Sequence, residues 1–142
     1  MTFTTRLDHG QRLVVFFWKD ALSQDDLSRN LDVFRAPDFP AHYDLIHMFD
    51  GSMDVLINHN AVVGHAIERQ RSLILRNVDH EIRSAFVAVP DTLKSLVEVW
   101  STFFPEADQS LMIRTFDTLD EALDWLGRKP FDEAALETYT VR

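Results

Sequence analysis

The strongest constraint on the fold is a regular alternation between short β-prone runs and segments with apolar residues at helical spacing. Strand-like runs occupy residues 12–18, 43–49, 82–89 and 111–116, and a helical pattern follows each of them. A weakly alternating stretch precedes the first run and ends at His9-Gly10, a turn signal, which predicts a hairpin. This alternation predicts a mostly parallel sheet with right-handed crossovers.

The ends of the helical segments carry recognisable signals. Ser23 with Asp26 forms a capping-box pattern, Asn58 can cap a second helix, and Pro90-Asp91 precedes a third. Asp117 is expected to cap a fourth helix that ends at Gly127. The strand runs are apolar on both faces, which is typical of sheets covered by helices on both sides. We therefore expect an α/β fold with a mixed, mostly parallel five-stranded sheet and four helices.

Composition restricts the class of protein further. The chain has 142 residues, of which 46% are apolar, so we expect one domain over residues 1–127 with an extension over 128–142. That extension is compatible with a short helix around 132–138, with an arm on a partner, or with fraying. The absence of cysteine excludes disulfides and thiol chemistry, and four scattered glycines exclude a phosphate-binding loop.

Charge and hydropathy exclude several partners. A net charge of −9 argues against nucleic acid and against anionic lipid surfaces. No apolar run is long enough to span a bilayer, and no secretory signal precedes the first strand, so we expect a cytoplasmic protein. The six histidines show no metal-ligand spacing, because His59 and His65 fall on different helix faces. We expect neither a metal nor a cofactor.

Two stretches carry a resemblance to a known family. They are Tyr43–Asp50 with the loop and helix that follow, and the segment FDTLDEALDWLG over residues 116–127. Together with the order of the elements over residues 3–127, they resemble the SpoIIAA-like or STAS (sulfate transporter and anti-sigma factor antagonist) fold. The resemblance implies a non-enzymatic regulatory module that acts by binding another protein or a second copy of itself, as a homodimer.

The resemblance also implies where such binding occurs. In phosphorylation-controlled members an Asp ends a strand, and Asp-Ser-Ser-Gly opens the next helix with its second Ser phosphorylated. Asp50 takes the place of the first Asp, and Asn58, His59, Asn60 and Ala61 stand in the four-residue motif. The phosphorylatable serine is therefore missing. The implied binding surface consists of Asp50, Ser52, Asn58, His59 and Asn60.

The aromatic content suggests an alternative function. Trp100, Phe103 and Phe104 widen the apolar stripe of the helix predicted after Pro90. A full hydrophobic core accounts for such residues, and so does an apolar pocket between this helix and the sheet that takes a lipid-like small molecule. Both interpretations stay open at this stage.

An enzymatic function is the least favoured interpretation. Ser52 lacks the second glycine of a nucleophile elbow, and paired acids such as Asp120 and Glu121 stand where they complement a helix dipole. His59 or His65 would be the candidate catalytic groups, but no partner is apparent for either. We expect a protein that is not an enzyme.

Overall fold

The chain begins with the predicted hairpin. In the computed structural model, which describes residues 2–104 and 111–141, β1 (Phe3–Asp8) and β2 (Leu13–Trp18) pair antiparallel. Asp8 stabilises the turn, because its Oδ1 accepts a hydrogen bond from the backbone N–H of Gln11 at 3.0 Å.

Within the described residues, six strands form the main sheet in the order β7-β6-β4-β2-β1-β8. From β2, the strands β4 (Asp44–Phe49), β6 (Ile82–Val87) and β7 (Leu111–Phe116) follow as parallel neighbours. A mixed, mostly parallel sheet is thus confirmed. It has one strand more than the five expected, because β8 (Glu137–Tyr139) pairs antiparallel with the outer edge of β1.

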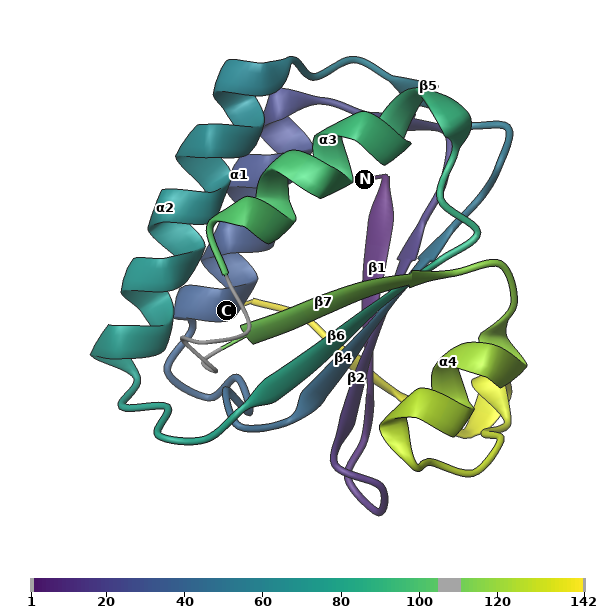
Figure 1. The fold of residues 1–142 in the computed structure, drawn as a ribbon. Coiled ribbons are helices and arrows are strands. Elements are labelled where there is room, and N and C mark those ends of the chain that lie inside the picture. Colours follow the sequence, from purple (N-terminus) through teal and green to yellow (C-terminus); the bar gives the residue numbers. More distant parts are fainter. Residues whose placement is uncertain (1, 105–110, 142) are drawn as a thin grey trace.

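In the described part of the chain, four α-helices cover both faces of this sheet, as predicted (Figure 1). One face carries α1 (Gln24–Arg35), α2 (His59–Leu75) and α3 (Asp91–Thr102). The other face carries α4 (Leu119–Leu126), which contacts β4, β6 and β7. Beyond the sheet, two short strands, β3 (Ala21–Leu22) and β5 (Asp54–Val55), pair parallel to each other.

Local sequence explains most of the element boundaries. Ser23 and Asp26 form the predicted capping box of α1, and Asn58 caps α2. Thr118 caps α4 in place of the expected Asp117, and its hydroxyl accepts from Glu121 N at 3.3 Å. Gly127 ends α4 at φ +66°, a conformation that glycine adopts without strain.

The strand predicted over residues 82–89 is shorter in the structure. β6 ends at Val87, because Ala88 has φ +57°, which turns the backbone out of the extended conformation. The Ala88 N–H still donates to Phe116 O at 2.9 Å, so the chain leaves the sheet only after this bond.

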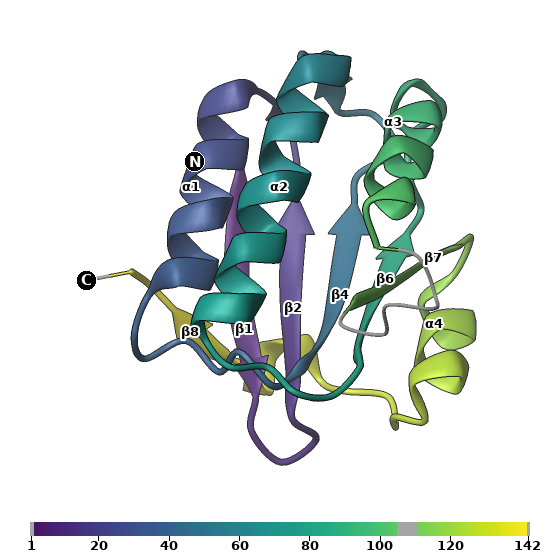
Figure 2. The same ribbon diagram turned by 60° about the vertical axis from the view of Figure 1, so that its left-hand side comes forward.

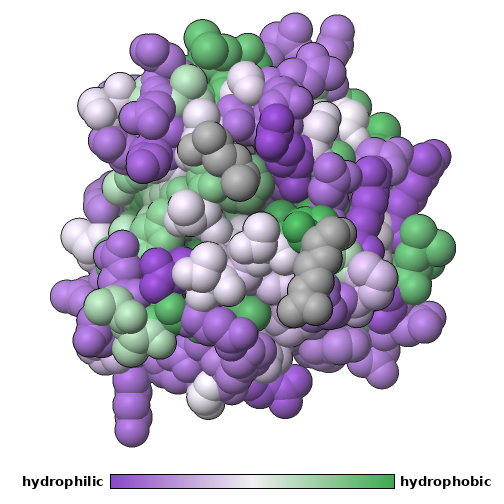
Figure 3. Space-filling view, turned by 180° about the vertical axis from the view of Figure 1, so that it is seen from behind, coloured by the Kyte–Doolittle hydropathy of each residue, from purple (hydrophilic) through white to green (hydrophobic). Residues whose placement is uncertain are grey.

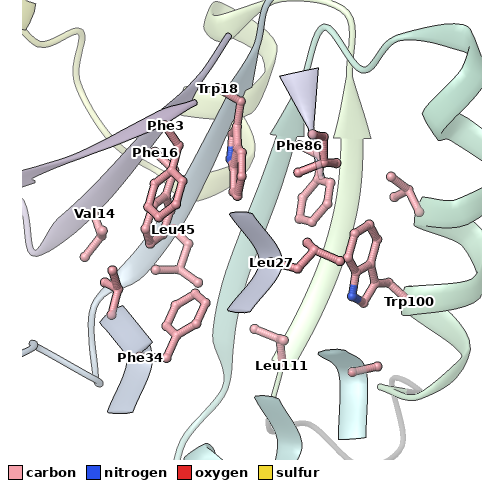
Figure 4. Close-up of a cluster of buried hydrophobic side chains, with 14 of the residues drawn as sticks. Phe3, Val14, Phe16, Trp18, Leu27, Phe34, Leu45, Phe86, Trp100 and Leu111 are labelled. Carbon is pink, nitrogen blue, oxygen red and sulfur yellow. The ribbon is translucent and has the colours of Figure 1, made fainter. Parts of the chain in front are cut away.

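The hydrophobic core has two parts, one on each face of the sheet. Alternate residues of a strand point to opposite faces, so Leu45 packs under α1–α3 while Ile46 packs under α4. Figure 4 shows the larger part, where side chains from β2, β4 and β6 meet those of α1 and α3. On α2, Val62, Ala66 and Leu73 are buried, whereas Ile67 is 38% exposed.

The C-terminal extension packs against its own chain. A 3-10 helix (Glu133–Ala135) precedes β8, and Arg6 donates to the carbonyls of Glu133 at 3.1 Å and Leu136 at 2.7 Å. Figure 2 shows β8 alongside β1 at the edge of the sheet. The opposite side of the molecule from Figure 1 has a mostly hydrophilic surface with smaller apolar areas between (Figure 3).

None of the helices described here combines the length and the apolar character needed to cross a bilayer.

Candidate functional site

The predicted binding surface lies at the edge where β4 ends and α2 begins. All five of its residues are exposed. Asp50 Oδ1 accepts from the backbone N–H of Ser52 at 3.0 Å and from its hydroxyl at 2.8 Å, and these bonds lower the pKa of Asp50. Asn58 Oδ1 accepts from Ala61 N at 2.9 Å. These contacts form a turn and a helix cap.

His59 and Asn60 complete this set as the first two residues of α2. Next to them, Leu56 is 67% exposed, which is unusual for a leucine in this protein. The surface therefore combines polar side chains with one apolar side chain.

Of the three aromatic residues predicted to form an apolar pocket, Trp100 lines an internal cavity. Phe104 is buried in the core cluster and Phe103 packs against it, and neither belongs to the cavity wall. Both follow the last turn of α3, where the chain has already left the helix face that Trp100 occupies.

The cavity has a volume of about 40 Å³ and lies between the sheet and α1–α3. Most of its wall is apolar: Trp18, Leu22, Leu27, Phe34, Leu45, Phe49, Phe86, Trp100, Leu111 and Ile113. In Figure 4, Trp18, Phe86 and Trp100 lie around Leu27. A space of this size holds about three water molecules or a small organic group.

Five polar residues complete the wall: Asn30, His47, His65, Arg69 and Ser84. Sequence reasoning named His65 only as a candidate catalytic group and missed the other four residues. Polar side chains inside an apolar core cost free energy unless each finds a partner. Their hydrogen bonds therefore decide what the cavity can bind.

His47 is held neutral on the floor of the cavity. Trp18 Nε1 donates to His47 Nδ1 at 3.1 Å, and an indole N–H can only donate, so the imidazole proton sits on Nε2. The imidazole stacks on Phe16 with ring centres 4.9 Å apart. Burial, and then the nearby bases His65 and Arg69, lower the pKa of His47 to about 3.

His65 repeats this arrangement between α2 and α3. Trp100 Nε1 donates to His65 Nδ1 at 3.0 Å, so His65 Nε2 carries the proton and donates to Asn30 Oδ1 at 3.1 Å. His65 is half-buried, and both of its imidazole nitrogens are engaged by these bonds. Burial, with Arg69 and Arg35 nearby, lowers the pKa of His65 to about 3.

This chain of bonds leaves the Asn30 amide half satisfied. Asn30 is 1% exposed, its oxygen is occupied by His65, and its Nδ2 has no hydrogen-bond partner. The orientation of the Asn30 amide follows from the Trp100 bond. Because Trp100 donates to Nδ1 of His65, the His65 proton lies on Nε2. That N–H needs an acceptor, so the Asn30 oxygen and not its nitrogen faces His65. An N–H donor group is thus buried beside the cavity without an acceptor.

Arg69 is the buried cation of the site. It is 5% exposed, and its guanidinium carbon lies 3.7 Å from the centre of the Phe34 ring. Nη1 donates to Ser72 Oγ at 3.1 Å, and within the described residues no carboxylate pairs with it. Burial, and then the charge of Arg76, lower the pKa of Arg69 to about 9, so it stays protonated at neutral pH.

A second cluster of titratable groups lies at the surface. The ligand atoms of His42, Asp79 and His80 all lie within 4.8 Å of one another, and all three residues are exposed. The His42 and His80 rings stack with centres 5.2 Å apart. The sequence did not predict this cluster, because its residues lie far apart in the chain. His42 precedes β4, whereas Asp79 and His80 follow α2. Both ring nitrogens of His80 are engaged within the cluster, since Nδ1 lies 3.3 Å from Asp79 Oδ1 and Nε2 lies 3.3 Å from His42 O.

Comparison with known proteins gives no match to a family model, to a curated protein or to a solved structure. The function must therefore be argued from the chemistry of the sites themselves.

Proposed function

We propose that this protein binds a small molecule in the cavity between its sheet and α1–α3. One observation carries the proposal: at the wall of an apolar cavity the buried Asn30 Nδ2 has no acceptor, and the buried Arg69 has no carboxylate among the described residues, only Ser72 Oγ and the Phe34 ring. A buried charge without a partner costs several kcal/mol, on the order of 3 to 5 kcal/mol in proteins whose buried ion pairs are broken. A bound ligand removes this cost.

A route to the cavity runs between α1 and α2. Leu27 and His65 line the cavity and also line a surface groove of about 220 Å³ between these helices. Gly64 borders the same groove, and no heavy atom lies within 4 Å of the position that a Cβ would take there. Displacement of the Leu27 side chain would join the groove to the cavity and enlarge it, while His65 keeps its bonds to Trp100 and Asn30.

Protein NMR tests the proposal directly, because the Trp18 and Trp100 indole N–H groups report on the cavity wall. We expect these two resonances to shift on titration with hexanoate or 1-hexanol, while the indole of Trp125, which belongs to α4 on the other face of the sheet, does not respond. If neither compound moves the Trp18 and Trp100 resonances up to its solubility limit, the cavity is not a binding site.

Two neighbouring residues of β4 provide a matched control. Leu45→Ala enlarges the cavity, whereas Ile46→Ala removes a similar volume from the opposite face of the sheet. We expect Leu45→Ala to tighten 1-hexanol binding and Ile46→Ala to leave it unchanged, although both variants lose about 2 to 5 kcal/mol of stability. Equal effects of the two substitutions on the affinity for 1-hexanol would argue against binding in the cavity.

A second candidate is the regulatory protein-binding role that the STAS resemblance implies, with another protein or a second copy as partner. It is supported by the exposure of Asp50, Ser52, Asn58, His59 and Asn60 beside the exposed Leu56. His59→Glu and Asn60→Glu are expected to weaken association in light scattering while leaving the melting temperature nearly unchanged. Ser95→Glu, exposed on α3, is the control. An association that survives both His59→Glu and Asn60→Glu excludes this surface.

Neither candidate function includes a reaction, so the protein is proposed as a binding protein and not as an enzyme. The cytoplasmic location and the lack of a nucleic-acid partner remain predictions from charge and sequence.

A further inference from the structure

The polar groups of the cavity wall are arranged as donors on one side. Asn30 and Phe34 are four residues apart on α1, and His65 and Arg69 are four apart on α2, so each pair occupies successive turns of one helix face. Asn30 contacts His65, and Phe34 contacts Arg69. Asn30 Nδ2, which has no acceptor, and the Arg69 guanidinium, which donates to Ser72 but faces no carboxylate among the described residues, therefore lie on the same α1–α2 wall.

Neither imidazole of the described cavity wall offers an acceptor to these donors. Both imidazole Nδ1 atoms already accept from tryptophans, and both Nε2 atoms carry protons. Arg69 is the one charged side chain of the described cavity wall, because His47 and His65 are neutral. The site thus combines one positive charge, the unpaired Asn30 Nδ2 donor and an apolar remainder.

We infer that the cavity is a receptor for a monocarboxylate, with the carboxylate at Arg69 and Asn30 and an apolar body against Trp18, Phe86 and Trp100. This inference rests on the proposed function and specifies its ligand class. A planar carboxylate matches the planar donor fork of a guanidinium, and a single arginine balances a single negative charge. A dianionic phosphate would leave one charge uncompensated in an apolar site.

The alternative is a purely structural Arg69, held only by the Phe34 ring and Ser72. In that case the cation contributes nothing to ligand choice, and replacing it by an apolar side chain of similar length leaves any ligand preference unchanged. The two explanations therefore differ in a measurable property, which is the preference between an acid and the matching alcohol.

The experiment measures dissociation constants for hexanoate and 1-hexanol by NMR, because these probes share a chain and differ in charge. The wild-type protein is expected to bind hexanoate at least about tenfold more tightly than 1-hexanol. Arg69→Met is expected to abolish this preference. Arg71→Met, which removes an exposed arginine from the same helix, is expected to retain it.

The possible results distinguish a failure of the carboxylate inference from a failure of the proposed function. Equal affinities of the wild type for acid and alcohol overturn the carboxylate inference but leave the proposed function intact. A preference that persists in Arg69→Met also overturns it. If neither probe binds, the proposed function itself is refuted. If Arg69→Met does not fold, Arg69→Lys replaces it and is expected to keep the charge but weaken hexanoate binding, since the fork is lost.

Chain length identifies the size of the natural ligand. Acetate, butyrate, hexanoate and decanoate are compared under the same conditions. Affinity that rises with length indicates opening toward the α1–α2 groove and a fatty-acid-like ligand, whereas a maximum at acetate indicates a small acid held within the closed cavity. Chloride binding with no response to any of these acids would contradict the inference.

Discussion

Single buried polar residues define the character of this protein more than its many aromatic ones do. Trp18 and Trp100 each donate to an imidazole, and in doing so they fix both histidine tautomers. The tautomer of His65 then orients Asn30, whose remaining N–H group points to no acceptor. One hydrogen bond from Trp100 thereby sets the donor pattern of the cavity wall.

Asn30→Asp tests this chain of contacts at the level of one atom. The new carboxylate would accept from His65 Nε2 and place a negative charge near Arg69, so the pKa of His65 is expected to rise above its lowered value of about 3. The internal carboxylate is also expected to weaken hexanoate binding. NMR titration of the imidazole measures the pKa, with the exposed Asn60→Asp as control. An unchanged pKa would mean that Asn30 does not face His65.

At the scale of elements, capping signals and periodicity predicted the helices well, and the errors have local causes. β6 stops early because Ala88 adopts a positive φ, and α4 is capped by Thr118, whose neighbour Asp117 is an equally good capping residue by type. The pattern of apolar residues predicts neither the early end of β6 nor the cap of α4 at Thr118.

The cavity could have been partly anticipated at this scale. Asn30 stands three residues after Leu27 and four before Phe34, and Arg69 stands between Ala66 and Leu73 at the same spacing. A polar residue at a helix position where the spacing calls for an apolar one is the signal that the sequence offers. What sequence cannot supply is the register of β2, β4 and β6, which places Phe16, His47 and Phe86 in one row.

Asn58→Ala separates capping from recognition at the start of α2. Loss of the bond from Ala61 N is expected to lower the free energy of unfolding by about 1 kcal/mol. Asn60→Ala, in the first turn and exposed, is expected to change it by less than about 0.5 kcal/mol. Urea denaturation measures both. A stability loss at Asn60 equal to that at Asn58 would contradict the assignment of the cap.

At the scale of the whole molecule, acid sensitivity follows from the buried imidazoles. The pKa of His47 falls from 6.5 to about 3 on folding, so between these pH values the unfolded chain binds a proton that the folded chain does not. Stability therefore rises with pH across this window and is lost on acidification, by at most about 1.4 kcal/mol per pH unit for this one group.

His47→Gln checks the assignment, because a Gln oxygen can still accept from Trp18 but does not titrate. We expect its free energy of unfolding to depend less steeply on pH than that of the wild type over the same window. His59→Gln, which changes an exposed histidine, should reproduce the wild-type slope. Urea denaturation at a series of acidic pH values distinguishes them, and parallel curves for all three proteins would assign the acid sensitivity to other groups.

The pairing of β1 with β8 has a consequence for how the protein is made. Arg6 finds its carbonyl acceptor 130 residues further along the chain. During synthesis the hairpin therefore emerges from the ribosome long before the segment that shields its outer edge, and that edge stays open to nascent chains on neighbouring ribosomes. Translation speed and chaperone supply should accordingly govern the yield of native protein more strongly than its final stability does.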